Sequence, residues 1–234
     1  MKITVNGIEC EYEISEPLGD TDTVLFLHGW GGGLKSFEHA YTVMSGIAPC
    51  VNFAFPSSVP SYWGVYDYAT LVDCFSEAIG ISKPVIVGHS FGGRIAIILA
   101  ARDKAKKIVL ADSAGLKPKF SLKRKMRIAA YRRAKKCGKP LDGYGSIDYN
   151  NLEQSMREVF VRIVNMHLDS LLPFIKCDTL IFWGRNDRDT PMYMAKRLNR
   201  GIKNSRLITV DGGHYSYVDA SHKFIQQLKS FVTE

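Results

Sequence analysis

The fold of this chain is decided by one stretch, Pro84-Val85-Ile86-Val87-Gly88-His89-Ser90-Phe91-Gly92-Gly93-Arg94-Ile95-Ala96-Ile97-Ile98-Leu99-Ala100. The run 84–87 is short, apolar and mostly β-branched, which is typical of a strand covered on both faces. The run 94–100 predicts a buried helix. Ser90 lies in the tight turn between them, where its hydroxyl would project at the carboxyl end of the strand, and Gly88 and Gly92 leave room for the chain to double back. This context favours a nucleophilic serine; the alternative is a serine that caps an ordinary helix.

The rest of the chain alternates strand and helix patterns. Apolar runs predict strands at 24–27, 51–55, 107–111, 179–183 and 206–210, and helical spacing predicts helices at 68–79 and 222–232. Near the start of the chain, Asn6-Gly7 between the runs 3–5 and 8–14 is a strong signal for a β-hairpin with a type I′ turn. This alternation predicts an α/β fold, with a mostly parallel central sheet and helices on both faces.

The alternation stops between Asp112 and Asp178, where no run is convincing as a strand. Helix-like sequence fills this segment instead, and one face of its first helix would carry Met126, Ala129, Ala130, Ala134 and Cys137. We therefore predict a core formed by residues 1–113 and 174–234, with a helical insertion over 114–173 that lies above the sheet.

Length and composition restrict the class of protein. A chain of 234 residues is enough for one α/β domain with a small insertion. No apolar run approaches the roughly 18 residues of a membrane span, and the first residues lack the apolar core of a signal peptide. The five cysteines are scattered, which favours reduced thiols in a cytoplasmic protein. No cluster of His, Cys, Asp or Glu has metal-ligand spacing, so we expect neither a metal nor a cofactor.

The positive charge is concentrated in one segment. The net charge is +8, yet residues 117–139 contain eleven basic residues and no acidic one, so the rest of the chain is mildly acidic. These residues are Lys117, Lys119, Lys123, Arg124, Lys125, Arg127, Arg132, Arg133, Lys135, Lys136 and Lys139. A solvated helix face is one interpretation; attraction of an anionic substrate, an acidic partner or a membrane surface is the other. No nucleic-acid-binding module accompanies the charge, so we expect no nucleic-acid partner.

A serine hydroxyl needs a base within hydrogen-bond reach, and the base needs a group that orients it. In an open parallel sheet such residues lie on loops at the carboxyl ends of the strands. His214 meets this condition after the run 206–210, in Asp211-Gly212-Gly213-His214. The other histidines are less suitable: His28 ends an early strand, His89 lies in the serine turn, and His39, His167 and His222 fall in helix-like sequence.

Three aspartates could supply the orienting acid. Asp187 is favoured because it lies in the loop after the run 179–183. Asp112 also follows a strand and is the second candidate. Asp189 is closer to the next helix, where a carboxylate is favoured near the N-terminus. A capping or solvated loop carboxylate is the alternative for all three.

Acyl transfer also needs donors for the developing oxyanion. The backbone N–H of Phe91, directly after the serine, is one candidate. The second is the N–H of Trp30 in the loop His28-Gly29-Trp30-Gly31-Gly32-Gly33. This loop lacks the Lys-Ser/Thr of a phosphate-binding P-loop, and a plain flexible turn is the remaining alternative.

Together, the serine turn 88–93, the loop 28–31, Asp187 and His214 resemble the α/β-hydrolase superfamily, whose chain order is also Ser, Asp, His. The resemblance implies that Ser90 is the nucleophile, Asp187 the acid and His214 the base. It implies that Trp30 and Phe91 supply the oxyanion donors and that the insertion is a cap. The similarity is greatest to small cofactor-free carboxylesterases and carbon–carbon bond hydrolases.

The chain departs from many relatives at Phe55-Pro56-Ser57-Ser58, where they carry Asp-x-Pro-Gly-x-Gly. Substrate preference is therefore not inferred from that loop. Haloalkane dehalogenases and epoxide hydrolases resemble this chain less, because they place an aspartate at the position of Ser90.

The predicted activity is hydrolysis of a carboxylic ester, with a thioester as a variant, through an acyl-enzyme. The substrate would be a small acyl compound, and an anionic one is among the options. A carbon–carbon bond hydrolase or a proton-abstracting lyase could use the same residues, and a ligand receptor without turnover is the third alternative.

Overall fold

The computed structural model describes residues 1–15, 22–120, 122–138, 147–150 and 152–234. Its centre is one eight-stranded sheet with the order β1-β2-β4-β3-β5-β6-β7-β8. The strands are β1 (Lys2–Val5), β2 (Ile8–Ile14), β3 (Val24–Leu27), β4 (Cys50–Ala54), β5 (Val85–His89), β6 (Lys107–Ala111), β7 (Asp178–Gly184) and β8 (Ser205–Val210). β3 to β8 all run parallel to one another, and β2 is antiparallel to both β1 and β4. The predicted mostly parallel sheet is confirmed.

The hairpin at the start of the chain forms as expected. Asn6 and Gly7 join β1 to β2 and both have a positive φ, 50° and 78°. A type I′ turn requires this conformation at its two central residues, which is why Asn-Gly is favoured there.

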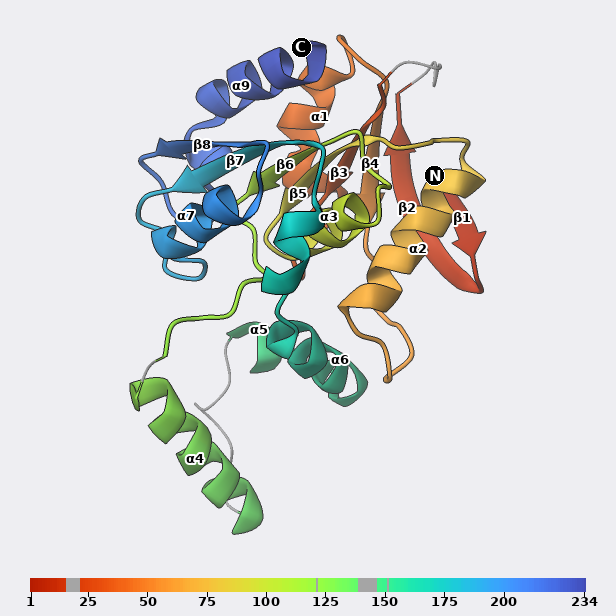
Figure 1. Ribbon diagram of the computed structural model, residues 1–234. Coiled ribbons are helices and arrows are strands. Elements are labelled where there is room, and N and C mark those ends of the chain that lie inside the picture. Colours follow the sequence, from red (N-terminus) through yellow and green to blue (C-terminus); the bar gives the residue numbers. More distant parts are fainter. Residues whose placement is uncertain (16–21, 121, 139–146, 151) are drawn as a thin grey trace.

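Helices cover both faces of the sheet (Figure 1). α2 (Val65–Ala78), α3 (Phe91–Ala101) and α7 (Met192–Gly201) pack on one face, and α1 (Glu38–Met44) and α9 (Ser221–Thr233) pack on the other. The alternation of side chains along a strand divides the core accordingly. In β3, Leu25 and Leu27 join the α2–α3 side, whereas Val24 and Phe26 join the α1–α9 side.

Between β6 and β7 the described residues form helices and no strand: α4 (Leu122–Lys136), α5 (Ile147–Asn150), α6 (Gln154–Asn165) and η2 (Asp169–Phe174). α6 packs against the core through Met156, Val159 and Ile163. The basic α4 extends away from the body of the molecule (Figure 1). The short elements η1 (Leu34–Phe37) and α8 (Ser216–Asp219) lie in the loops after β3 and β8.

Within these ranges, no helix combines the length and the apolar composition needed to cross a bilayer. All five cysteines are free thiols.

Candidate active site

Ser90 sits in a strained turn between β5 and α3. Its φ of 48° and ψ of −104° lie outside the regions that residues with a Cβ usually adopt. The turn is held from both sides, because the Ser90 N–H donates to Ala111 O at 3.2 Å and the Ala114 N–H donates to Ser90 O at 3.0 Å.

The two glycines that flank the serine are required by close backbone contacts. A Cβ on Gly88 would lie 2.6 Å from the carbonyl carbon of Gly92, and a Cβ on Gly92 would lie 2.0 Å from Leu27 O. This confirms why the sequence has no side chain at either position.

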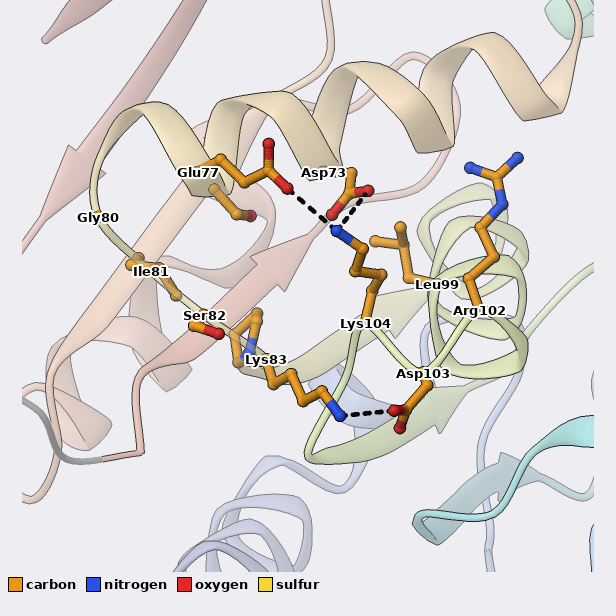
Figure 2. Close-up of a pocket in the computed structure, with 12 residues that line it drawn as sticks. Asp73, Glu77, Gly80, Ile81, Ser82, Lys83, Leu99, Arg102, Asp103 and Lys104 are labelled. Carbon is orange, nitrogen blue, oxygen red and sulfur yellow. Dashed lines mark hydrogen bonds and ion pairs between the residues drawn. The ribbon is translucent and has the colours of Figure 1, made fainter.

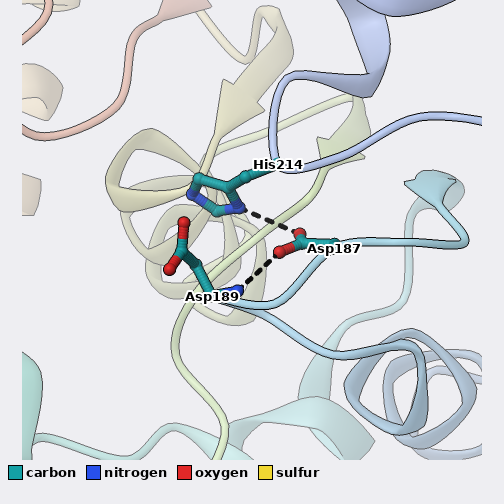
Figure 3. Close-up of side chains that lie close together, drawn as sticks. All are labelled: Asp187, Asp189 and His214. Carbon is teal, nitrogen blue, oxygen red and sulfur yellow. Dashed lines mark hydrogen bonds and ion pairs between the residues drawn. The ribbon is translucent and has the colours of Figure 1, made fainter.

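Ser90, His214 and Asp187 come together at the carboxyl ends of β5, β8 and β7. Ser90 Oγ lies 3.0 Å from His214 Nε2, and His214 Nδ1 lies 2.9 Å from Asp187 Oδ2. Figure 3 shows the imidazole beside the Asp187 carboxylate. Nδ1 must carry a proton to donate to the carboxylate, so Nε2 of the neutral ring is free to accept the serine proton.

The electrostatics of this pair favour a positive imidazole. Burial lowers the pKa of His214, but its hydrogen bond to Asp187 and the charge of that carboxylate outweigh burial and leave the pKa raised. For Asp187, burial raises the pKa, but the hydrogen bonds from His214 and Thr190 outweigh it and leave the pKa lowered. Asp187 therefore stays ionised, and its charge favours the protonated form of His214.

Thr190 supports this arrangement and was not singled out from the sequence. Its N–H donates to Asp187 Oδ1 at 2.9 Å and its hydroxyl donates to Asp187 Oδ2 at 2.5 Å. Trp183 Nε1 in turn donates to the carbonyl of Thr190 at 2.8 Å, which ties the loop to β7. The pattern Asp-x-x-Thr, in which a carboxylate accepts from the residue three positions later, was the available signal.

The two other candidate acids take different positions. Asp112 is fully buried and accepts from the backbone N–H groups of Gly184 and Ser216, both at 2.9 Å. Burial raises its pKa to about 6. It thus links the ends of β6 and β7 to α8 and makes no hydrogen bond to His214. Asp189 is exposed, and its N–H donates to Asp187 Oδ1 at 2.8 Å.

Asp187, Asp189 and His214 each place one potential ligand atom within 4.8 Å of the others (Figure 3). Asp187, however, already accepts four hydrogen bonds, from Asp189 N, Thr190 N, Thr190 Oγ1 and His214 Nδ1. Because the carboxylate of Asp187 is already occupied by these hydrogen bonds, the three residues are better suited to proton transfer than to metal coordination.

The loop after β3 is fixed by a buried histidine. His28 Nε2 accepts from the Phe55 N–H at 3.0 Å, so its proton is on Nδ1, which donates to Gly29 O at 2.7 Å. The Gly92 N–H donates to His28 O at 3.1 Å and joins this loop to the first turn of α3. For the N–H groups of Trp30 and Phe91, the described residues provide no acceptor. Both predicted donors therefore remain available to a ligand.

A cavity of about 590 Å³ opens beside Ser90. Its walls come from the loop 29–32, the start of α3, residues 160–164 of α6, and the loops that carry Thr190 and His214. A smaller cavity of about 220 Å³ adjoins it at Trp30 and Phe91 and is lined by Phe55, Tyr68 and Met156. This volume suits a small organic substrate.

Another hollow, of about 520 Å³, lies near the amino ends of β5 and β6, away from Ser90. Figure 2 shows the side chains that line it. Its charges pair with one another: Lys104 lies 3.3 Å from Asp73 and 3.0 Å from Glu77, and Lys83 lies 2.6 Å from Asp103. Because these groups satisfy each other in solvent, the hollow has the character of an ordinary polar surface.

The free energy of unfolding should depend on pH through His89. Its Nε2 lies 2.7 Å from His214 O, and burial, followed by the charge of His214, lowers its pKa to about 3. The unfolded chain binds a proton at this histidine near pH 6.5, whereas the folded chain does not, so acid favours unfolding. Between about pH 7.5 and pH 5, His89 should thus remove about 2 kcal/mol from the free energy of unfolding.

Urea unfolding of wild type and His89→Gln at both pH values checks this. The glutamine keeps a donor for His214 O but does not titrate, so the stability advantage of the wild type should shrink by about 2 kcal/mol at the lower pH. A difference that stays constant with pH would contradict a neutral, buried His89.

Comparisons with known proteins agree with the fold. A family model described as alpha/beta hydrolase fold matches residues 22–136. The AB hydrolase superfamily protein YisY of Bacillus subtilis is 28% identical, over 92% of this chain and 93% of that protein. The 2-hydroxy-6-oxo-2,4-heptadienoate hydrolase of Pseudomonas putida is 23% identical, over 98% of this chain and 95% of that protein. The solved structure of an esterase (EaEST) from Exiguobacterium antarcticum has a TM-score of 0.79 at 19% identity, covering 100% of this chain and 99% of that one.

The family model and these relatives support the α/β-hydrolase superfamily that the sequence resembles. The fold predicted from the sequence is confirmed.

Proposed function

We propose that this protein is a serine hydrolase that cleaves a carboxylic ester, with a thioester as a variant, through an acyl-enzyme intermediate. One observation carries the proposal: the continuous hydrogen-bonded chain from Ser90 Oγ through His214 to Asp187, at 3.0 and 2.9 Å. A strained serine, a correctly oriented imidazole and an ionised carboxylate are the parts that nucleophilic catalysis at an acyl carbon needs.

In the proposed reaction Ser90 Oγ attacks the ester carbonyl while its proton passes to His214 Nε2. The N–H groups of Trp30 and Phe91 donate to the oxyanion of the tetrahedral intermediate. This intermediate breaks its bond to the alkoxide, which leaves with the proton from His214. Water then attacks the acyl-serine, with His214 again as the base, and releases the acid and free Ser90.

The insertion 114–173 is proposed as the cap of the site, on a core formed by 1–113 and 174–234. α6 supports this assignment, because Phe160, Ile163 and Val164 line the cavity beside Ser90. Among the basic side chains of α4 that the structure describes, Arg132, Arg133 and Lys136 line neither this cavity nor the smaller one. The cytoplasmic location predicted from the cysteines stays a prediction.

Cleavage of a carbon–carbon bond is the second candidate. The relative from Pseudomonas putida is named for a hydroxy-oxo acid, which contains no ester bond, and its similarity extends over nearly the whole chain. The same serine, histidine and aspartate could serve that reaction.

A substrate comparison tests the proposal. Wild type is assayed with p-nitrophenyl acetate, butyrate and hexanoate, with a short acyl thioester, and with 2-hydroxy-6-oxo-2,4-heptadienoate. We expect kcat/KM for the best ester or thioester to exceed kcat/KM for the heptadienoate by about 100-fold or more, within the usual range of enzyme specificity. The rate should fall as the pH drops through the raised pKa of His214, since the base must be neutral. Faster turnover of the heptadienoate than of every ester and thioester would overturn the proposal in favour of carbon–carbon bond cleavage.

A further inference from the structure

The cavity beside Ser90 contains a buried cation. Arg94 lies in the first turn of α3, four residues after Ser90, and lines the cavity while only 7% of it is exposed. Its Nη1 donates to the carbonyl of Met166 at 2.7 Å. In the part of the chain that the structure describes, the guanidinium has no other acceptor and no carboxylate partner.

This arrangement leaves most of the guanidinium unused. Arginine has five N–H donors in a planar fork, and Met166 O takes one of them. Burial lowers the pKa of Arg94 to about 10, so the group remains charged near neutral pH. A buried charge without a counter-ion is costly, and a structural role alone would need only a neutral donor for one carbonyl. The site is thus built to receive an anion.

We propose that Arg94 binds a carboxylate of the substrate, so that the preferred ester carries a carboxylate a few carbons from the scissile carbonyl. This rests on the proposed ester hydrolysis. Four residues of helix separate Arg94 from Ser90, a rise of about 6 Å along α3, which matches the length of a short dicarboxylic acid. The guanidinium fork can hold such a carboxylate through two parallel hydrogen bonds.

The other residues of the cavity favour a substrate whose carboxylate lies at Arg94 and whose ester carbonyl lies at Ser90. Three apolar residues line the same cavity, Ala114 together with Ile163 and Val164 of α6, and apolar surroundings strengthen the attraction between a cation and an anion. The acidic side chain of the same cavity, Asp189, lies beside His214 (Figure 3). Its repulsion directs a substrate carboxylate towards Arg94.

A matched pair of esters tests the assignment. Mono-p-nitrophenyl glutarate and p-nitrophenyl 5-methylhexanoate have nearly the same shape, but only the first is anionic. We expect wild type to prefer the glutarate ester by about tenfold or more in kcat/KM. Arg94→Met should lose this preference, because kcat/KM for the glutarate ester should fall about tenfold further than kcat/KM for the neutral ester, and Arg94→Lys should retain part of it. Arg102→Met, at the far end of α3, is the matched control and should keep the wild-type preference.

The succinate and adipate half-esters locate the best chain length, and 4-acetoxybenzoate against phenyl acetate tests a carboxylate in the leaving group instead. If wild type prefers neither anionic series over its neutral counterpart, the proposal is overturned. It is also overturned if Arg94→Met lowers the rates on the glutarate ester and on the neutral ester equally, which is the result expected if Arg94 only holds Met166 in place.

Two measurements keep the test valid if a variant misfolds or the activity differs. In wild type, glutarate should inhibit p-nitrophenyl acetate hydrolysis about tenfold more strongly than glutaramide, its uncharged diamide, and equal inhibition would count against Arg94. If no ester is turned over, ester hydrolysis is refuted, and Arg94 is judged by thermal unfolding alone: glutarate should raise the Tm of wild type more than that of Arg94→Lys, and no rise in wild type overturns the assignment.

Discussion

Replacing Ser90 by alanine is expected to lower kcat for p-nitrophenyl butyrate by about 10⁴- to 10⁶-fold. The alanine keeps the turn but removes the atom that His214 Nε2 faces at 3.0 Å, so no acyl-enzyme can form. The residual rate should come from the oxyanion donors and the cavity alone. Pre-steady-state release of p-nitrophenol, measured with purified protein, distinguishes a lost acylation step from a slow deacylation.

Ser82→Ala is the matched control for this substitution. Ser82 lies near the amino end of β5, in the hollow of paired charges, and should leave kcat unchanged (Figure 2). A Ser90→Ala enzyme within about tenfold of wild type would contradict the assignment of the nucleophile, because losses on this scale are far below those of nucleophile removal.

Gly92→Ala is expected to cost about 3 kcal/mol or more of the free energy of unfolding. The new Cβ would lie 2.0 Å from Leu27 O and 2.8 Å from His28 O. Both contacts are with backbone, so either the end of β3 or the first turn of α3 must move. The same displacement would break the hydrogen bond from Gly92 N to His28 O and shift the loop that carries Trp30.

Urea unfolding measures this cost, with Gly46→Ala as the control. Gly46 does not have a positive φ, and a Cβ there would meet only Val43 O at 3.7 Å, so that variant should stay within about 0.5 kcal/mol of wild type. If Gly92→Ala were as stable as Gly46→Ala, the close packing of the serine turn against β3 would be wrong.

Much of the fold could be predicted because local signals agreed with the tertiary structure. The apolar run 84–87, the glycines around Ser90 and the Asn6-Gly7 turn each have few alternatives at the level of backbone geometry. Asp187 and His214 each follow a strand of the parallel sheet, and loops after parallel strands lie at the same edge, so their position near Ser90 could also be predicted.

The remaining features depend on contacts that sequence spacing does not encode. Asp112 and Asp187 both follow strands, and only the positions of the Gly184 and Ser216 N–H groups separate a linking carboxylate from one that orients His214. Arg94 was predicted only as part of a buried helix. A charged residue in such an apolar run is unusual, and this was the available signal for a binding residue. The basic segment carries the strongest charge in the sequence, yet the described part of α4 extends away from the body of the molecule (Figure 1). No described residue of α4 lines the cavity beside Ser90.

The most direct test of the account is covalent labelling with a fluorophosphonate, read by peptide mass spectrometry. We predict that wild type gains one adduct, on Ser90, and that His214→Ala labels at least about 100-fold more slowly because the serine has lost its base. Labelling at a different serine, or no labelling of Ser90 in folded wild type, would contradict the claim that Ser90, His214 and Asp187 act together.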